Sequence, residues 1–199
     1  MKKLLATSAF ALLSLTQAQA ADFNFTGNIA THKDVVSIDF TLATDATNVK
    51  VWTNSFLGGV NFDPITAVWA QNGSVWNLVG ENDDDASIDP GQTNWDSGLT
   101  FASLDAGNYR FTIATYNNFA NGTTLSDGFL FDNEAPIALA DWDQPANHVN
   151  MGTFYSVNLS GVDAATNVSA VPEPETLAML LAGLGLVGAI ARRRRAQAA

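Results

Sequence analysis

Hydrophobic and polar residues alternate with a period of two through much of the middle of this chain. The alternation is clearest at residues 35–42, where one face would carry Val36, Ile38, Phe40 and Leu42 and the other Ser37, Asp39 and Thr41. Successive side chains of a β-strand point to opposite faces, so this pattern predicts a half-buried strand. The same pattern predicts strands at residues 49–53, 65–69, 75–79, 99–104, 109–113, 129–131 and 154–159.

Residues that favour turns separate these predicted strands. Glycine occurs beside asparagine, aspartate or a second glycine at positions 58–59, 72–73, 106–108, 121–122 and 127–128. Asn72-Gly73, between two apolar runs, is the strongest hairpin signal. No part of this region has sustained helical periodicity. Seven to nine short strands at this spacing predict an all-β fold, an antiparallel, jelly-roll-like β-sandwich over residues 22–162.

The first twenty residues have the pattern of a signal peptide. Two lysines precede an apolar segment at residues 4–15, and Ala18 and Ala20 supply the small residues of a cleavage site. The apolar segment is too short for a permanent membrane anchor. We therefore expect an N-terminal signal helix that signal peptidase removes by cutting after Ala20, so that the following domain is exported.

The other end of the chain has a second targeting pattern. Pro172, Glu173 and Pro174 precede an apolar run at residues 177–191, and four basic residues follow it: Arg192, Arg193, Arg194 and Arg195. The run predicts a single transmembrane helix. A helix of that length rises about 22 Å against a hydrocarbon core of about 30 Å, so we expect snorkelling arginines or local bilayer thinning. The arginines place their end in the cytoplasm. Small polar residues at 163–170 predict a spacer, and a simple tail anchor is the alternative interpretation.

Together, the Pro-Glu-Pro sequence, the apolar run and the arginine cluster of residues 171–195 resemble the PEP-CTERM sorting signal. Proteins with this signal are exported by Gram-negative bacteria that make exopolysaccharide. The resemblance implies a membrane-anchored precursor that an exosortase processes near the Pro-Glu-Pro. The product would be retained at the cell surface or in the extracellular matrix.

Charge narrows the possible partners of the predicted sandwich. Between residues 22 and 170, eighteen acidic residues face only three basic ones, Lys33, Lys50 and Arg110. A surface this negative repels nucleic acid and attracts cations, so nucleic-acid binding is excluded. The chain has no cysteine, hence no disulfide and no thiolate metal site. Its stability must come from the core or from bound ions.

An acidic run in the middle of the chain is a candidate calcium site. It comprises Glu81, Asp83, Asp84 and Asp85, with Asp89 four residues further on. Crowded carboxylates repel each other, and a hard cation with six to eight oxygen ligands relieves that repulsion. The spacing is not that of an EF-hand, and a solvated acidic turn is the alternative. Asp39 and Asp63 are further candidate ligands from neighbouring strands.

Aromatic residues suggest a second kind of site. Trp52, Trp95 and Trp142 occur in polar contexts and could stack on the apolar face of a sugar, although tryptophan is more often a core residue. For catalysis, in contrast, His32 and His148 are isolated, and no metalloprotease or nucleophile-elbow motif occurs. We expect His32 to lie at the surface and the protein not to be an enzyme.

Four short motifs, in this order, resemble the Phe-Asp-Pro variant of the pre-peptidase C-terminal-like β-sandwich family. They lie at residues 34–40, 62–65, 81–85 and 104–109, within a resemblance that covers residues 23–116. Residues 117–158 depart from that pattern. The resemblance implies a small β-sandwich.

These features favour an exported surface or matrix protein with a structural or adhesive sandwich. A calcium-dependent carbohydrate-binding module is the main alternative, and a secreted hydrolase is a weaker one. The expected partners are signal peptidase, the exosortase, the membrane and exopolysaccharide.

Overall fold

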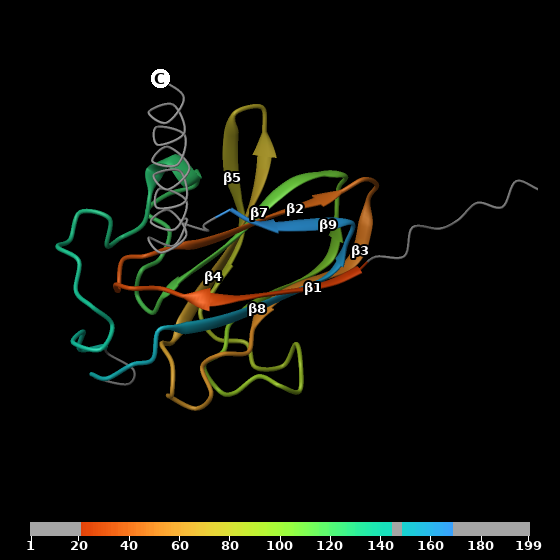
Figure 1. Cartoon of the computed structure of the whole chain (residues 1–199). Helices are drawn as coiled ribbons and strands as arrows, with labels where there is room; N and C mark the ends of the chain where they lie inside the picture. Colours follow the sequence, from red (N-terminus) through yellow and green to blue (C-terminus); the bar gives the residue numbers. More distant parts are fainter. Residues whose placement is uncertain (1–20, 145–148, 169–199) are drawn as a thin grey trace, which may run out of the picture.

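The computed structural model describes residues 21–144 and 149–168, and these form two antiparallel β-sheets (Figure 1). The signal peptide expected at residues 1–20 and the sorting signal expected at 171–195 lie outside the described residues. Within the described part, no helix is long and apolar enough to cross a membrane. The predicted all-β class and two-sheet architecture are therefore confirmed for the middle of the chain.

One sheet has four strands in the order β1-β8-β3-β6, and the other has five in the order β5-β4-β7-β2-β9. The strands are β1 (Ala21–Asn28), β2 (Val36–Leu42), β3 (Ala46–Thr53), β4 (Pro64–Asn72), β5 (Val75–Asn82), β6 (Gly98–Leu104), β7 (Gly107–Thr115), β8 (Phe154–Val162) and β9 (Ala164–Asn167). A short 3-10 helix, η1 (Leu125–Asp127), lies in the connection between β7 and β8.

Most of the predicted strands are present. Asn72 pairs with Val75 across a two-residue turn that contains Gly73 at φ 62°, so the predicted hairpin is confirmed. The strand predicted at residues 129–131 is wrong. That segment turns back on itself instead, and the Asp132 carboxylate accepts a hydrogen bond from the Phe129 backbone N–H at 2.9 Å.

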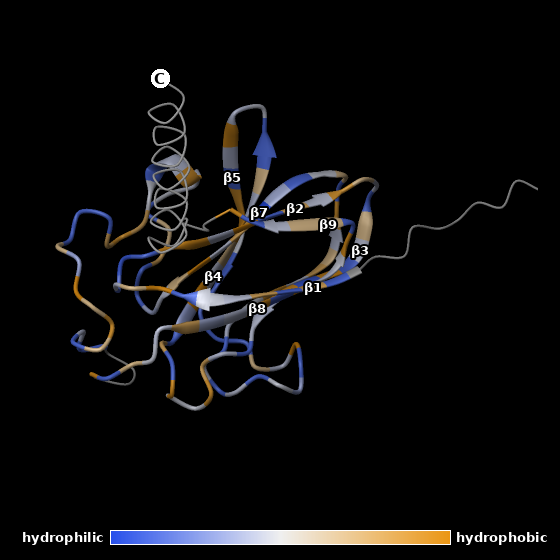
Figure 2. Cartoon of the chain, viewed as in Figure 1, coloured by the Kyte–Doolittle hydropathy of each residue, from blue (hydrophilic) through white to orange (hydrophobic). Residues whose placement is uncertain are grey.

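The main core lies between the two sheets. In β2, the inward residues are those that the alternation assigned to one face, Val36, Ile38, Phe40 and Leu42. They face inward residues of the other sheet such as Val51 and Leu159. Figure 2 shows that hydrophobic and hydrophilic residues occur within single strands, as one buried face per strand requires. Burial of this apolar surface is the main source of stability in a chain without disulfides.

A second, smaller core covers the outer face of the five-stranded sheet. Trp69 of β4 and Ala114 of β7 pack there with Phe129 from the β7–β8 connection. The indole Nε1 of Trp69 donates a hydrogen bond to the Thr112 hydroxyl at 2.9 Å, so the buried ring leaves no unpaired donor. This cover explains why the first six residues of β4 are buried on both faces.

His32 was expected at the surface, and that expectation is wrong. Its side chain is 0% exposed and lies against the rings of Phe131 and Trp142. The Ile137 backbone N–H donates to His32 Nδ1 at 3.2 Å, which leaves Nε2 to donate to the Glu134 carboxylate at 3.0 Å. The ring therefore fixes the β7–β8 connection against the sandwich.

The spacer predicted at residues 163–170 also differs from the structure. Ala164–Asn167 forms β9, which pairs with β2 from Ile38 to Thr41 and adds an edge strand to the five-stranded sheet. Small polar residues suit an edge strand as well as a spacer, because only one side of such a strand needs a partner. The sandwich therefore extends beyond the boundary expected at residue 162.

The two faces of the strands give the first testable prediction. Phe111→Ala should lower the free energy of unfolding by about 3–5 kcal/mol, because it leaves a cavity between the sheets. Phe154→Ala, at the 38%-exposed position of β8, is the control, since Phe111 is 0% exposed. Urea unfolding of both variants measures the difference. Equal losses of stability would contradict the assignment of Phe111 to the core.

Candidate cation site

Three carboxylates meet where the β4–β5 hairpin opens. Asp63 immediately precedes β4, and Asp83 and Asp84 immediately follow β5. Because the two strands are antiparallel, with Thr66 opposite Asn82, the residue before one strand lies beside the residues after the other. The hairpin itself therefore brings together acids about twenty residues apart in the sequence.

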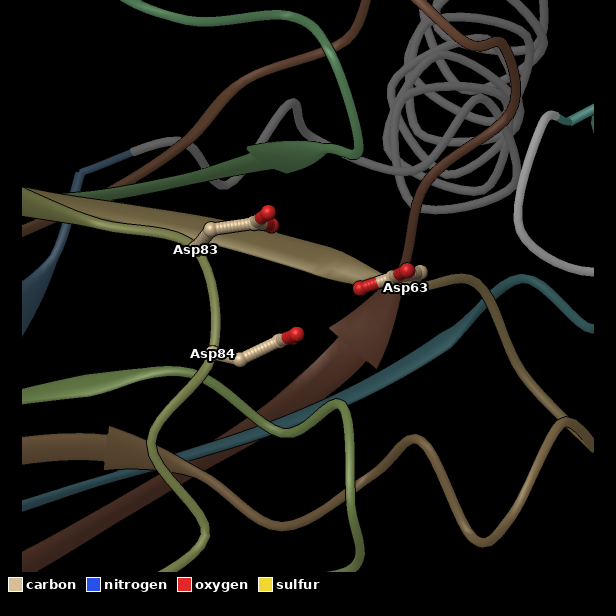
Figure 3. A group of neighbouring side chains, drawn as sticks. All are labelled: Asp63, Asp83 and Asp84. Atoms are coloured by element: carbon tan, nitrogen blue, oxygen red, sulfur yellow. The ribbon is translucent and has the colours of Figure 1, made fainter.

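The carboxylates are close enough to share one ion. One oxygen from each of Asp63, Asp83 and Asp84 lies within 4.8 Å of the others. Figure 3 shows the three side chains pointing toward a common space. Asp63 is only 3% exposed, whereas Asp84 is exposed. The cluster thus runs from the protein interior to solvent.

Two carboxylate oxygens of these three residues have no partner in the protein. Asp63 Oδ1 and Asp83 Oδ1 are buried and accept no hydrogen bond. A buried carboxylate oxygen without a partner is costly, because desolvation favours the neutral form. The unpaired oxygens therefore point to a missing positive group, either a proton or a metal ion.

Burial and mutual repulsion alter the acidity of the cluster. Burial, reinforced by the charges of Asp84, Asp83 and Asp96, raises the pKa of Asp63 to about 8. Burial and the charge of Asp84 raise the pKa of Asp83 to about 6, and burial raises the pKa of Asp84. A bound cation would act in the opposite direction by favouring the ionised carboxylates.

The other predicted ligands are not part of the cluster. Glu81 accepts a hydrogen bond from the Ala120 backbone N–H at 2.8 Å, and Asp89 accepts one from that of Gly91 at 2.8 Å. Asp85 accepts one from the Ser87 N–H at 2.9 Å. Asp39 forms a two-point ion pair with Arg110 at 2.6 and 2.9 Å. The structure therefore brings together Asp83, Asp84 and the further candidate Asp63, but not Glu81, Asp85, Asp89 or Asp39.

Asp96 positions the cluster, and the sequence analysis did not identify it. Its buried carboxylate accepts five hydrogen bonds, from the Ser55, Phe56 and Thr93 N–H groups and the Thr53 and Thr93 hydroxyls. These bonds join the loop after β3 to the loop between β5 and β6. Both loops flank the carboxylates, so Asp96 holds the cluster in place through the backbone.

The three candidate tryptophans lie at separate places. Trp52 is on the outer face of β3, as its position beside the inward Val51 predicts. Trp95 packs against Phe56 at 5.2 Å between ring centroids. Trp142, a candidate for sugar stacking with a core role as the alternative, is 8% exposed and packs against Phe131, so it is a core residue and unavailable to a sugar. His148 lies outside the described residues.

A comparison with protein-family models matches residues 170–195 to the PEP-CTERM protein-sorting motif. This match agrees with the resemblance stated for residues 171–195. The motif implies an exported protein that an exosortase processes and that is sorted to the cell surface. The comparisons do not support the resemblance of residues 23–116 to the Phe-Asp-Pro family.

Among solved structures, the chain is similar to the Yersinia pseudotuberculosis-derived mitogen. The identity is 14%, the TM-score is 0.41, and the match covers 77% of this chain and 96% of the mitogen chain. At this level the likeness carries no argument about function, and the sandwich stands on its own strand pairing. No curated protein matches the sequence.

The raised pKa of Asp63 predicts how stability depends on pH without metal. Since the folded-state pKa, about 8, exceeds the ordinary value of 3.8, the folded protein retains a proton that the unfolded chain releases. This contribution is complete below about pH 4 and is lost as pH rises toward 8. In chelator, the melting temperature should therefore fall between pH 5 and 8.5, and Asp63→Asn should flatten the decline.

Asp89→Asn is the control for this pH series. It removes one negative charge close to the cluster in sequence, but its carboxylate binds the Gly91 N–H instead. Melting curves of both variants and the unsubstituted protein across the pH range separate the two effects. If the melting temperature of Asp63→Asn falls with pH as steeply as that of Asp89→Asn, Asp63 is not the source of the pH dependence.

Proposed function

We propose that this chain is a non-catalytic surface protein whose acidic sandwich binds calcium at Asp63, Asp83 and Asp84. The proposal rests on two observations: Oδ1 of Asp63 is buried and unpartnered, and one carboxylate oxygen of Asp63 lies within 4.8 Å of oxygens of Asp83 and Asp84. The PEP-CTERM motif supports the surface location, because it implies export and sorting. Retention with exopolysaccharide is part of the same proposal.

The ligand chemistry favours calcium over other divalent ions. The cluster offers only carboxylate oxygens, whereas zinc sites use histidine or cysteine and this chain has no cysteine. Magnesium requires a small, nearly octahedral shell and usually keeps several waters. Calcium accepts irregular sets of six to eight oxygens, so three carboxylates at the edge of solvent can be completed by water or backbone carbonyls.

A cation at this place would join two segments of the chain. Asp63 immediately precedes β4, and Asp83 and Asp84 begin the loop that leads to β6 in the other sheet. Coordination would therefore hold the β5–β6 loop against the sandwich. A metal bridge of this kind serves an exported domain that has no disulfide to constrain its loops.

A structural or adhesive role accords better with this geometry than hydrolysis. The described histidine, His32, is buried, and its two ring nitrogens form hydrogen bonds with the Glu134 carboxylate and the Ile137 N–H rather than with the cluster. The cluster brings together acids alone, whose shared repulsion is the feature that a bound ion relieves. Hydrolysis of a polysaccharide by the purified protein would overturn this part of the proposal.

Calcium should raise the melting temperature, and Asp63→Asn should abolish the shift. At a calcium concentration about 100 times Kd, linkage gives about 2.7 kcal/mol, or roughly 5–10 °C for a domain of this size. Differential scanning calorimetry with calcium and with chelator measures it. Asp85→Asn, which removes a charge from the same run outside the cluster, should keep the shift. An unchanged melting temperature in millimolar calcium would contradict the site.

The sorting proposal predicts the ends of the mature protein. In a host with an exosortase, mass spectrometry of the surface fraction should find an N-terminus at Ala21 and a C-terminus that lacks Arg192–Arg195. Replacing Pro172 and Pro174 by alanine should prevent processing, so that the arginines stay on the protein. The control Pro90→Ala, in the sandwich, should be processed normally and lose them. An intact arginine tail on surface-retained, unsubstituted protein would instead indicate a simple membrane anchor.

A further inference from the structure

A second candidate site lies on the outer face of the four-stranded sheet, away from the carboxylate cluster. A solvent-open pocket of about 370 Å³ is formed there by β1, β8 and β3, with one wall from the β5–β6 loop. Trp52 of β3, Asn158 of β8 and Asn24 of β1 form its floor, and Ile88 and Asp89 come from the loop. Its volume lies in the range of about 300–1,000 Å³ that is common for small-ligand sites.

The wall of this pocket depends on Gly98. A Cβ at this position would lie 2.6 Å from Ile88 Cδ1 and 2.7 Å from Trp52 Cβ, so any larger residue would push the two side chains apart. Gly98 pairs with Trp52 across the β3–β6 ladder. The absence of a side chain therefore lets Ile88 pack beside the indole and build an apolar wall on an otherwise open sheet face.

Polar groups surround the aromatic ring. Asn24 Nδ2 donates to Asn158 Oδ1 at 2.8 Å, which fixes the orientation of the Asn158 amide. The remaining donors on the floor, Asn158 Nδ2 and Trp52 Nε1, are buried and have no partner. Lys50 lines the same pocket, together with the carboxylates of Asp22 and Asp89. Phe23 of β1 is the second aromatic residue of the lining, so the pocket combines two aromatic rings with amide, ammonium and carboxylate groups.

We propose that this pocket binds an uncharged pyranose unit of a polysaccharide. The C–H groups on one face of a pyranose are weakly positive and stack on the negative face of an aromatic ring such as Trp52. The sugar hydroxyls both donate and accept hydrogen bonds, so they match a lining with amides, carboxylates and a lysine.

The negative charge of the pocket and of the sandwich favours an uncharged sugar over an acidic sugar or a nucleic acid. Two carboxylates and one ammonium line the pocket, so its local charge is negative and an acidic sugar is disfavoured. The excess of acids over bases in the sandwich repels nucleic acid, which could otherwise stack a base on Trp52. An uncharged sugar ring combines the required apolar face with several hydroxyls and carries no opposing charge.

This inference does not depend on the cation site. The floor belongs to the sheet, and only the wall of Ile88 and Asp89 shares the β5–β6 loop with Asp83 and Asp84. The protein can therefore be stabilised by calcium and not bind sugar, or bind sugar and not be stabilised by calcium. Each result tests its own site.

Isothermal titration of the mature protein, in calcium and in chelator, tests the pocket. The probes are cellohexaose, mannohexaose and galactohexaose, with oligogalacturonate as the acidic counterpart. We expect a neutral oligosaccharide to bind and Trp52→Ala to weaken it by about tenfold or more, as loss of a central aromatic contact does. Ser160 of β8 also lines the pocket, so Ser160→Gln, which extends a longer side chain into it, should block binding although Trp52 is unchanged.

Trp76→Ala is the matched control. Trp76 is a half-buried tryptophan in β5 of the other sheet, where the Arg110 guanidinium lies over its ring at 4.7 Å. This variant should bind the sugar normally. The proposal is overturned if no neutral probe binds, if only oligogalacturonate binds, if Trp52→Ala binds as tightly as the unsubstituted protein, or if Trp76→Ala loses as much affinity.

Discussion

Mutual repulsion among carboxylates that the fold itself brings together is the constraint on which this structure depends. The β4–β5 hairpin places Asp63 beside Asp83 and Asp84, and burial of Asp63 removes the water that would screen the charges. The protein must neutralise this group with a proton or a metal ion. The five hydrogen bonds to Asp96 keep the flanking loops in place, so the acids cannot relieve the strain by moving apart.

Aspartates elsewhere in the sandwich accept hydrogen bonds from backbone N–H groups in turns. This role explains much of the sandwich's negative charge. The Asp34 carboxylate accepts hydrogen bonds from the Ala30 and Thr31 N–H groups at 2.8 and 2.9 Å, and Asp127 accepts one from that of Thr124 at 2.9 Å. A short acceptor that satisfies backbone donors suits the turns between strands. The negative charge is therefore partly a consequence of how the loops are built. A run of acids does not by itself mark a metal site.

Hydrophobic alternation and turn residues were enough to predict most strands. The carboxylate cluster could be predicted only from the register in which β4 and β5 pair. Alternation identified the inward face of β2, and Asn72-Gly73 identified the β4–β5 hairpin. Counting back from the Asn72–Val75 pair of that hairpin would have placed Asp63 opposite Asp84, at the acidic run. No local pattern reveals that the β7–β8 connection covers His32, because the residues that bury it, such as Trp142, lie about a hundred positions away in the sequence. The same holds for β9, whose composition is that of a spacer and whose strand form depends on the edge of β2.

The pairing of the first strand with the penultimate one has a consequence for secretion. Among the described residues, β1 pairs with β8 alone, and the second neighbour of β2, besides β7, is β9. Such distant contacts form late, because a long loop must close before they stabilise anything. Until β8 and β9 have been synthesised, the polypeptide cannot complete its two sheets. The chain is therefore still incompletely folded, and able to pass through a narrow translocation channel, until nearly the whole domain has been made.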